Sequence, residues 1–354
     1  MYVLRGKLDI NLCVGGALAP AWLFLLPKFN PRPGVPVLER LEEIDFAGTI
    51  LMLGAMVSGV FAINFGGVIY AWNSGRIIGL FCCSGVLFIL FGIQQGLTIF
   101  TTVERRIFAV QFLKRRTMIL MFIATACGSS AIFVPIYFIP LYFQFVRNSS
   151  AIEAGVHLLP FVCILVFFCI ANGGIMSATG WYFPWFLGGG IFTVIGMSLL
   201  YTVTESSSDT TVYGYSVLAA VGSGSFVQAG FSVAQAKVGA ALIPEAIGFV
   251  TLAQLLGATV SLAIGDSVFL NEANNNIAAI LPTTSRSDIN GAISGASTTL
   301  LSSLDPETRA NVIHGIVTAM SKVYILGITA GAAVTVAALA MRREKMFMKV
   351  GAAA

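Results

Sequence analysis

Apolar segments long enough to cross a membrane occupy most of this 354-residue chain. An uninterrupted apolar run of about 18 or more residues is typical of a transmembrane helix. Nine such runs are present, at residues 10–28, 46–70, 77–100, 118–146, 155–177, 184–204, 212–236, 245–270 and 323–341. The chain is 57% hydrophobic and 10% charged, whereas soluble proteins carry about 25% charged residues. The sequence therefore predicts an all-α, polytopic membrane protein with about nine transmembrane helices.

The distribution of basic residues predicts how these helices are oriented. If the polar stretch at 28–45 is cytoplasmic, thirteen of the 20 lysines and arginines lie on the cytoplasmic side and seven on the external side. Cytoplasmic loops of membrane proteins carry an excess of lysine and arginine. We therefore expect an external N-terminus and a cytoplasmic C-terminus. These clusters explain the net charge of +4, which gives no indication of nucleic-acid binding.

Residue types that support catalysis or metal binding are few. All six cysteines lie in apolar segments without metal-ligand spacing, and the two histidines, His157 and His314, are far apart in sequence. There is no second acid within the membrane segments for an aspartyl pair, and no G-x-S-x-G nucleophile motif. We therefore expect no enzyme, no cofactor and no metal site.

The three longest polar stretches between the apolar segments have distinct features. The first, at 27–43, contains four prolines and cannot be one helix. The second, at 101–117, is predicted to be either a short amphipathic helix at the membrane surface or a plain basic loop. The third, at 271–322, is predicted to be a long external loop with a flexible middle. Within it, residues 305–320 are expected to form an amphipathic helix that lies on the membrane.

Polar side chains within the predicted spans are candidates for a substrate site, because they are costly to place in lipid. In the span 212–236, Ser225, Gln228, Ser232 and Gln235 recur at helical spacing, and Gln254 belongs to a weaker polar stripe in the next span. The two stripes either line a shared water-filled cavity or form interhelical hydrogen bonds, each worth about 0.6 kcal/mol. Both interpretations remain open on the sequence.

Asp266 is the acidic residue that lies well inside a predicted span. An ionisable group in such a position is a candidate proton carrier. The alternative is a structural position near the outer water interface, because the predicted external loop begins shortly afterwards, at Asn271.

The span 118–146 contains Pro135 and Pro140 among several aromatic residues, including Tyr137, and ends near Gln144. A proline inside a helix removes one backbone hydrogen bond and kinks the helix. In a membrane such a kink is tolerated where neighbouring groups satisfy the freed carbonyl. The pattern favours a gating or substrate-contact role, and the alternative is an aromatic girdle at the membrane interface.

Several short stretches resemble the fourteen-spanning drug:proton antiporters of the major facilitator superfamily, in the fungal toxin and multidrug efflux branch. They are 44–48 (IDFAG), 64–67 (NFGG) with 70–72 (YAW), 104–108 (ERRIF), 133–160 (FVPIYFIPLYFQFVRNSSAIEAGVHLLP), 213–218 (YGYSVL) and 249–269 (FVTLAQLLGATVSLAIGDSVF). The resemblance covers about residues 10–341 and assigns the nine spans to helices six to fourteen of the family. The topology that it implies agrees with the charge distribution.

The resemblance also implies a domain organisation. Residues 1–45 match the last helix of the N-terminal half and a cytoplasmic linker, and residues 46–117 match two extra linker helices with a basic cytoplasmic loop. Residues 118–354 match the C-terminal six-helix half, with its long external loop at 271–322. Helices one to five have no counterpart, so we expect a major facilitator fold that is N-terminally truncated. Because alternating access needs two halves, this chain alone is not expected to transport.

The function that the resemblance implies is efflux of small organic compounds, such as toxins, drugs or secondary metabolites, coupled to protons. The expected location is the plasma membrane, with the vacuolar membrane as the alternative. Two other functions remain open: a non-transporting accessory or inactive fragment that pairs with a full-length relative, and an importer of sugars or siderophores. The expected partners are thus a small organic substrate, a proton and the lipid bilayer, without nucleic acid.

Overall fold

The structure is a computed structural model that describes residues 15–20, 24, 34, 36, 43–293 and 304–346. The chain divides into two compact units, Met1–Ile44 and Asp45–Ala354. Residues 15–20 of the first unit form α-helix. The predicted span at 10–28 and the proline-rich stretch at 27–43 lie mostly outside the described residues.

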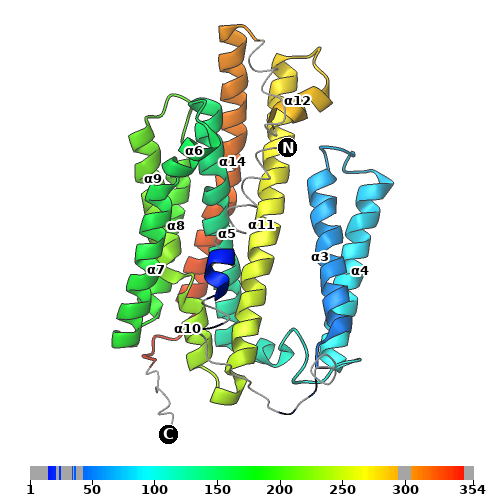
Figure 1. The fold of residues 1–354 in the computed structure, drawn as a ribbon, viewed down its shortest axis with the longest axis vertical. Coiled ribbons are helices and arrows are strands. Elements are labelled where there is room, and N and C mark those ends of the chain that lie inside the picture. The colour runs from blue at the N-terminus through cyan, green and yellow to red at the C-terminus, as the bar shows by residue number, and fades with distance from the viewer. Residues whose placement is uncertain are drawn as a thin grey trace. The chain divides into compact units, whose positions relative to one another are not determined.

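The second unit is helical, as Figure 1 shows, and its described part contains no β-strand beyond two isolated bridges. Its helices are α3 (Phe46–Phe65), α4 (Gly75–Leu97), η2 (Val110–Lys114), α5 (Arg116–Val146), α6 (Ala151–His157), α7 (Leu159–Thr179), α8 (Phe183–Tyr201), α9 (Asp209–Phe226), α10 (Ala229–Ala236), η3 (Ala240–Leu242), α11 (Ile243–Ile280), α12 (Arg286–Ile293) and α14 (Pro306–Leu339). Eight segments within the described residues are long and apolar enough to cross a membrane. The prediction of an all-α, multi-pass membrane protein is confirmed.

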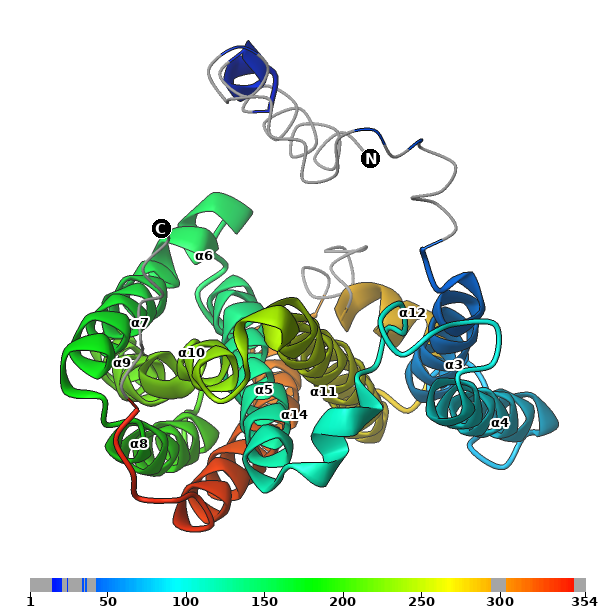
Figure 2. The same ribbon diagram turned by 90° about the horizontal axis from the view of Figure 1, so that it is seen from below.

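Helices α5, α11 and α14 occupy the middle of this unit. In the view of Figure 2 they lie between α7–α10 on one side and the α3–α4 pair on the other. Glycines allow close contacts between backbones: a Cβ at Gly257 of α11 would lie 2.2 Å from the carbonyl oxygen of Ala126 in α5. A Cβ at Gly196 of α8 would lie 2.3 Å from the backbone nitrogen of Ala219 in α9. Such approaches are how helices gain packing energy in lipid, where burial itself provides little driving force.

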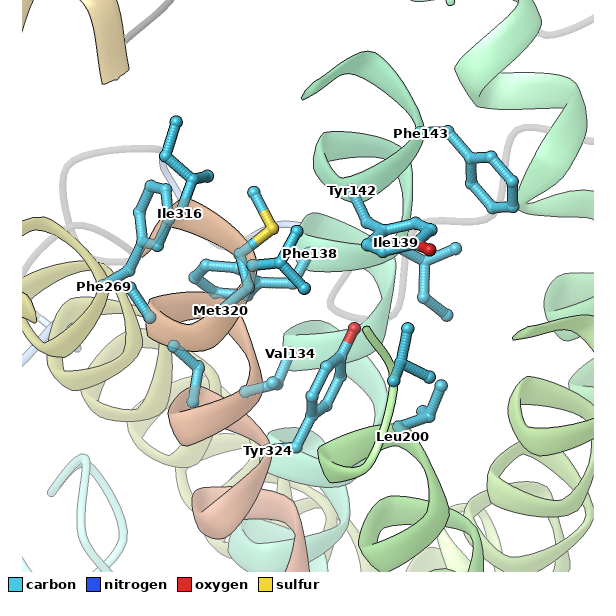
Figure 3. Packing of buried hydrophobic residues seen from close by; sticks show 14 of the residues in the cluster. Val134, Phe138, Ile139, Tyr142, Phe143, Leu200, Phe269, Ile316, Met320 and Tyr324 are labelled. Carbon is cyan, nitrogen blue, oxygen red and sulfur yellow. The ribbon is translucent and has the colours of Figure 1, made fainter. Parts of the chain in front are cut away.

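The largest cluster of buried side chains surrounds the second half of α5 (Figure 3). Phe138 of α5 and Phe269 of α11 meet edge to face, with ring centroids 5.6 Å apart. Met320 and Tyr324 of α14 belong to the same cluster. Aromatic pairs of this geometry contribute about 0.5–1.5 kcal/mol beyond their buried area. The cluster therefore joins the three central helices, α5, α11 and α14.

The helices extend into the stretch 271–322 that was predicted to be a loop. Helix α11 continues to Ile280 and α14 begins at Pro306. Hydropathy ends the predicted span near Asn271 because Asn271 and Asn274 are polar. Their Nδ2 groups donate to backbone carbonyl oxygens four residues earlier, at 2.8 and 2.7 Å, so both amides are accommodated within the helix.

The prediction of a separate surface helix at 305–320 is wrong. These residues begin the single unbroken helix α14, whose N-terminus is capped by the Asp305 carboxylate, which accepts from the Thr308 backbone N–H at 3.0 Å. Buried residues recur along the whole of α14, including its first turns. The flexible middle predicted for the loop falls at 294–303, outside the described residues.

The stretch 101–117 is a loop with one short 3-10 helix, η2, and it does not form an amphipathic α-helix. Its apolar side chains pack against the protein itself. Phe108 and Phe112 lie 5.2 and 5.6 Å, centroid to centroid, from the ring of Phe249 in α11. The loop that carries these basic residues is therefore attached to the helix bundle through its aromatic side chains.

Candidate substrate and proton site

Two residues that the sequence indicates for different reasons, Tyr137 and Asp266, line the same cavity. Tyr137 comes from α5 and Asp266 from α11, and Asn64 of α3 lies opposite them in a cavity of about 360 Å³. The Tyr137 side chain is 50% exposed and Asp266 is partly buried. Apolar residues complete the lining: Val60, Leu262 and Ala263, together with Thr259. The cavity thus combines one carboxylate, one phenol and one amide on three helices.

Helix α11 continues for roughly 20 Å beyond Asp266, to Ile280, at 1.5 Å per residue. The predicted loop therefore does not follow Asp266 directly. A structural position near the outer water interface stays the alternative, because α11 is longer than a membrane span requires. Its carboxylate has no hydrogen bond or ion pair with any residue that the structure describes. A carboxyl group in such surroundings can take up and release a proton without first breaking a salt bridge.

Asn64 was not selected from the sequence. Its Oδ1 atom is buried and has no hydrogen-bond partner within the described part of the chain. A buried acceptor without a partner costs about 1–3 kcal/mol, so it favours any donor that reaches it. A protonated carboxyl or a phenol is such a donor. The signal available in the sequence was the one amide side chain within the apolar run 46–70.

The predicted polar stripe of the span 212–236 is divided by a break in the helix. Helix α9 ends at Phe226, and Gln228 is the N-cap of α10. Ser225 is 6% exposed and its hydroxyl donates to the Val221 carbonyl oxygen at 2.6 Å, so it faces the interior. Hydroxyl groups that bond back by one turn weaken and bend helices. The remaining members of the stripe, Gln228 onward, are on a different helical segment from Ser225.

Interhelical hydrogen bonds do not account for the predicted polar residues. The side chains of Gln228, Ser232, Gln235 and Gln254 have no hydrogen-bond partner among the described residues, and Gln228 is exposed while the other three are partly exposed. The hydrogen-bond interpretation requires partners on a neighbouring helix, and the described residues supply none. The cavity interpretation stays a prediction.

The other candidates are spread along α5. That helix passes through Pro135 and Pro140 as one element of 31 residues, with Pro135 buried and Pro140 partly buried. Gln144 is exposed, about two turns beyond Tyr137. In the part of the chain described, the structure therefore unites Tyr137 with Asp266 and leaves Gln144 and the glutamines of α10 and α11 outside that cavity.

The chain is similar to fungal transporters over almost its whole length. It is 50% identical over 345 residues to the MFS-type transporter pgmG of Aspergillus terreus, which covers 97% of this chain and 61% of the relative. It is 44% identical over 353 residues to the efflux pump alnA of Emericella nidulans, covering 99% and 64%. It is 39% identical over 333 residues to the efflux pump patC of Aspergillus clavatus, covering 93% and 60%. The chain thus spans about three-fifths of the length of these curated relatives.

No family model matches the chain. Among solved structures, a bacterial homologue of the human lysosomal transporter Spinster, in an inward-facing and occupied conformation, aligns with 83% of this chain and 67% of its own, at 15% identity and a TM-score of 0.48. The sequence matches, in contrast, reach 50% identity. The chain is therefore a multi-pass membrane protein that is similar, over almost its whole length, to fungal proteins named MFS-type transporters and efflux pumps.

Proposed function

We propose that this protein acts in the export of small organic compounds across a membrane, coupled to the movement of protons. The observation that carries the proposal is the cavity shared by Asp266, Tyr137 and Asn64. Support also comes from relatives that are named efflux pumps. The compounds would be toxins, drugs or secondary metabolites, which are amphipathic enough to contact both apolar and polar side chains.

Asp266 is the proposed proton carrier. In the protonated form its carboxyl is neutral and can donate a hydrogen bond to the Asn64 Oδ1 atom, which has no described partner. In the ionised form it is a charge in largely apolar surroundings, which is costly until water, substrate or a rearranged helix stabilises it. Protonation of Asp266 would therefore favour one arrangement of α3, α5 and α11 over another.

The proposed substrate contacts are the polar side chains without described partners. Gln228, Ser232 and Gln235 would hydrogen-bond the substrate from α10, and Gln254 from α11. Gln144 and Tyr137 would contact it from α5. In addition, Pro135 and Pro140 would allow α5 to bend during gating, because each proline leaves a backbone carbonyl without its usual donor.

The proposed assignment of the chain follows the family. Helices α3 and α4 would be the two extra linker helices, and residues 118–354 the C-terminal six-helix half. The excess of basic residues at 101–117 and after α14 supports a cytoplasmic C-terminus. We propose the plasma membrane as the location, since export of a compound from the cell requires it there.

Asp266→Asn tests the proton site. The chain is expressed in a yeast strain that lacks its own drug pumps, and efflux of a fluorescent hydrophobic dye is measured with and without a pH gradient. Efflux by the unmodified chain is the first result required, and it would overturn the expectation that this chain alone does not transport. Asp266→Asn should lower gradient-driven efflux by about 10-fold. This lies within the usual range of coupling between two ligands of one protein, here the proton and the transported compound. Asp266→Glu should retain more, and Asp209→Asn, an exposed acid at the start of α9, should change little. Full gradient-driven efflux by Asp266→Asn would contradict the proposal.

Gln228→Ala tests the substrate contacts separately. Replacement should change which dyes are exported while leaving the amount of protein in the membrane unchanged. Loss of the protein without a selective defect would argue against a substrate contact. If the chain itself exports nothing but inhibits a co-expressed full-length relative, the accessory function would be favoured instead.

A further inference from the structure

A small basic cavity lies where α5 begins and α14 ends. It has a volume of about 200 Å³, and four cationic side chains line it: Arg115, Arg116, Lys237 and Arg342. They come from three separate parts of the chain, namely the start of α5, the connection after α10 and the segment after α14. No residue of the proposed substrate and proton site lines this cavity. The fold thus places four positive charges around one cavity, and the proposed proton site does not account for them.

The charge of this cavity is only partly neutralised by the protein. Lys237 Nζ donates to the Glu344 carboxylate. This hydrogen bond, together with the lysine charge, holds the pKa of Glu344 below its usual value. None of the three guanidinium groups forms an ion pair with a described residue, although the charge of Arg342 also helps to lower the pKa of Glu344. Arg115 Nη1 donates to the backbone carbonyl oxygen of Lys237, at 3.5 Å.

The backbone adds to the positive potential of the cavity. Helix α5 begins at Arg116, and its N-cap, Arg115, supplies no side-chain acceptor. The first N–H groups of a helix carry a partial positive charge and attract anions, phosphate in particular. Thr117 also lines the cavity and offers a hydroxyl donor beside these groups. The combination of guanidinium groups, helix N-terminus and hydroxyl suits a phosphate group.

Apolar residues indicate where that phosphate comes from. Met118 and Leu120 of α5 line the same cavity, together with Ala340, the C-cap of α14. Both helices are long and apolar enough to cross a membrane. The cavity therefore lies at the end of the membrane-spanning segments, where phospholipid headgroups are found. Basic pockets between transmembrane helices on the cytoplasmic side are suited to phosphorylated and anionic headgroups.

We propose that this cavity binds the phosphate-bearing headgroup of an anionic phospholipid from the cytoplasmic leaflet. The headgroup would bridge Arg116 of α5 and Arg342 after α14, and so hold the ends of these two helices together. The choice of leaflet depends on the cytoplasmic C-terminus proposed above. The site itself does not depend on the transported compound or on Asp266, so either proposal can fail without the other.

The test is lipid binding to the purified full chain, measured by native mass spectrometry in detergent. The probe is phosphatidylinositol, with phosphatidylcholine as the zwitterionic control and inorganic phosphate as the soluble anion. The double variant Arg116→Gln/Arg342→Gln should weaken phosphatidylinositol binding by roughly 10- to 30-fold, which is about 3- to 5-fold for each charge. Glu344→Gln should strengthen binding by about 3-fold, because it releases Lys237 from its partner.

A matched control comes from the immediate neighbours in sequence. Lys114 and Arg343 do not line the cavity, so Lys114→Gln/Arg343→Gln removes the same charge from the same side and should leave binding within about 2-fold of the unmodified chain. Equal effects of the two double variants would overturn the site, since only general charge would then matter. Binding of inorganic phosphate without preference for phosphatidylinositol would overturn the lipid assignment. The unfolding temperature, measured for every variant in phosphatidylcholine, separates loss of binding from loss of fold.

Discussion

The α3–α4 pair and the bundle from α5 to α14 are held together in different ways. In the most apolar 18-residue window of α9–α10, 67% of residues are buried, whereas the figure is 28% in α3 and 22% in α4; within the bundle it is as low as 17%, in α7. The bundle relies on close contacts between backbones along the length of its helices. The pair has few such contacts with the bundle and presents most of its apolar residues outward. Most of the apolar surface of α3 and α4 therefore faces away from the bundle.

Polar bonds at the two ends of the pair replace extended packing. At one end the buried Asp45 carboxylate accepts three hydrogen bonds, from the Gly48 backbone N–H at 2.8 Å, Gln94 Nε2 at 3.1 Å and Gln95 Nε2 at 2.6 Å. The Gln95 Oε1 atom in turn accepts from the backbone N–H of the loop residue Phe108 at 2.8 Å. We call Asp45, Gln94 and Gln95 the Asp45 cluster. It connects the start of α3, the end of α4 and the loop that packs on the bundle.

The opposite end of the pair is attached directly to α11. Asn271 Nδ2 donates to the carbonyl oxygen of Gly66 at 3.1 Å. Gly67 has a φ of +74°, and a Cβ there would lie 2.0 Å from Asn271 Oδ1, so glycine is required at this contact. Two cavities, including the one that contains Asp266, lie between this end of the pair and α11, and they involve Val60, Ile63 and Asn64 of the last turns of α3.

The largest effect should come from substitution inside the bundle. Gly257→Ala would place a Cβ 2.2 Å from the Ala126 backbone oxygen, which cannot move independently of α5. We expect destabilisation of about 2–3 kcal/mol, as for overpacking in a well-packed core. Gly85→Ala in α4 meets nothing within 4 Å and should be neutral or stabilising by up to about 1 kcal/mol. Thermal unfolding in detergent compares the two, and equal destabilisation would remove the distinction between the regions.

A slightly smaller and more local effect is expected at the Asp45 cluster. Asp45→Ala removes three hydrogen bonds, at a cost of about 1–3 kcal/mol. Gln94 Nε2 keeps its bond to the Ile99 carbonyl oxygen and Gln95 Nε2 its bond to Gln94 Oε1, whereas the Gly48 N–H loses its side-chain acceptor. Hydrogen exchange should accelerate in α3 and α4 and stay unchanged in α8 and α9. Asp45→Asn keeps one acceptor oxygen and should show an intermediate effect. Acceleration throughout the bundle would mean that the pair is not a separate unit of stability.

The smallest effect is expected at the other end of the pair. Asn271→Ala removes one hydrogen bond between α11 and Gly66 and should cost about 1 kcal/mol. Exchange should increase near the turn between α3 and α4, with the Asp45 cluster intact. A larger loss than that of Asp45→Ala would show that the Asn271 contact, rather than the Asp45 cluster, holds the pair in place.

Local patterns were sufficient to predict the membrane helices and some of the site. Hydropathy predicted each described span because a transmembrane helix needs only its own apolar residues and backbone bonds. Asp266 and Tyr137 were predicted as candidates because an acid within an apolar run and an aromatic between prolines are visible in one segment. Asn64 was missed, since one amide in an apolar run has no meaning until its neighbours are known.

The sequence by itself determined that this is a multi-pass helical membrane protein that resembles fungal transporters, because helix length, apolarity and motif are properties of continuous segments. The tertiary structure decided the rest. It placed Asp266, Tyr137 and Asn64 around one cavity, and it extended α11 and α14 beyond their apolar runs. It also joined Asp45 to glutamines 49 and 50 residues away. These features depend on contacts between distant segments, and no local pattern specifies which polar groups will meet.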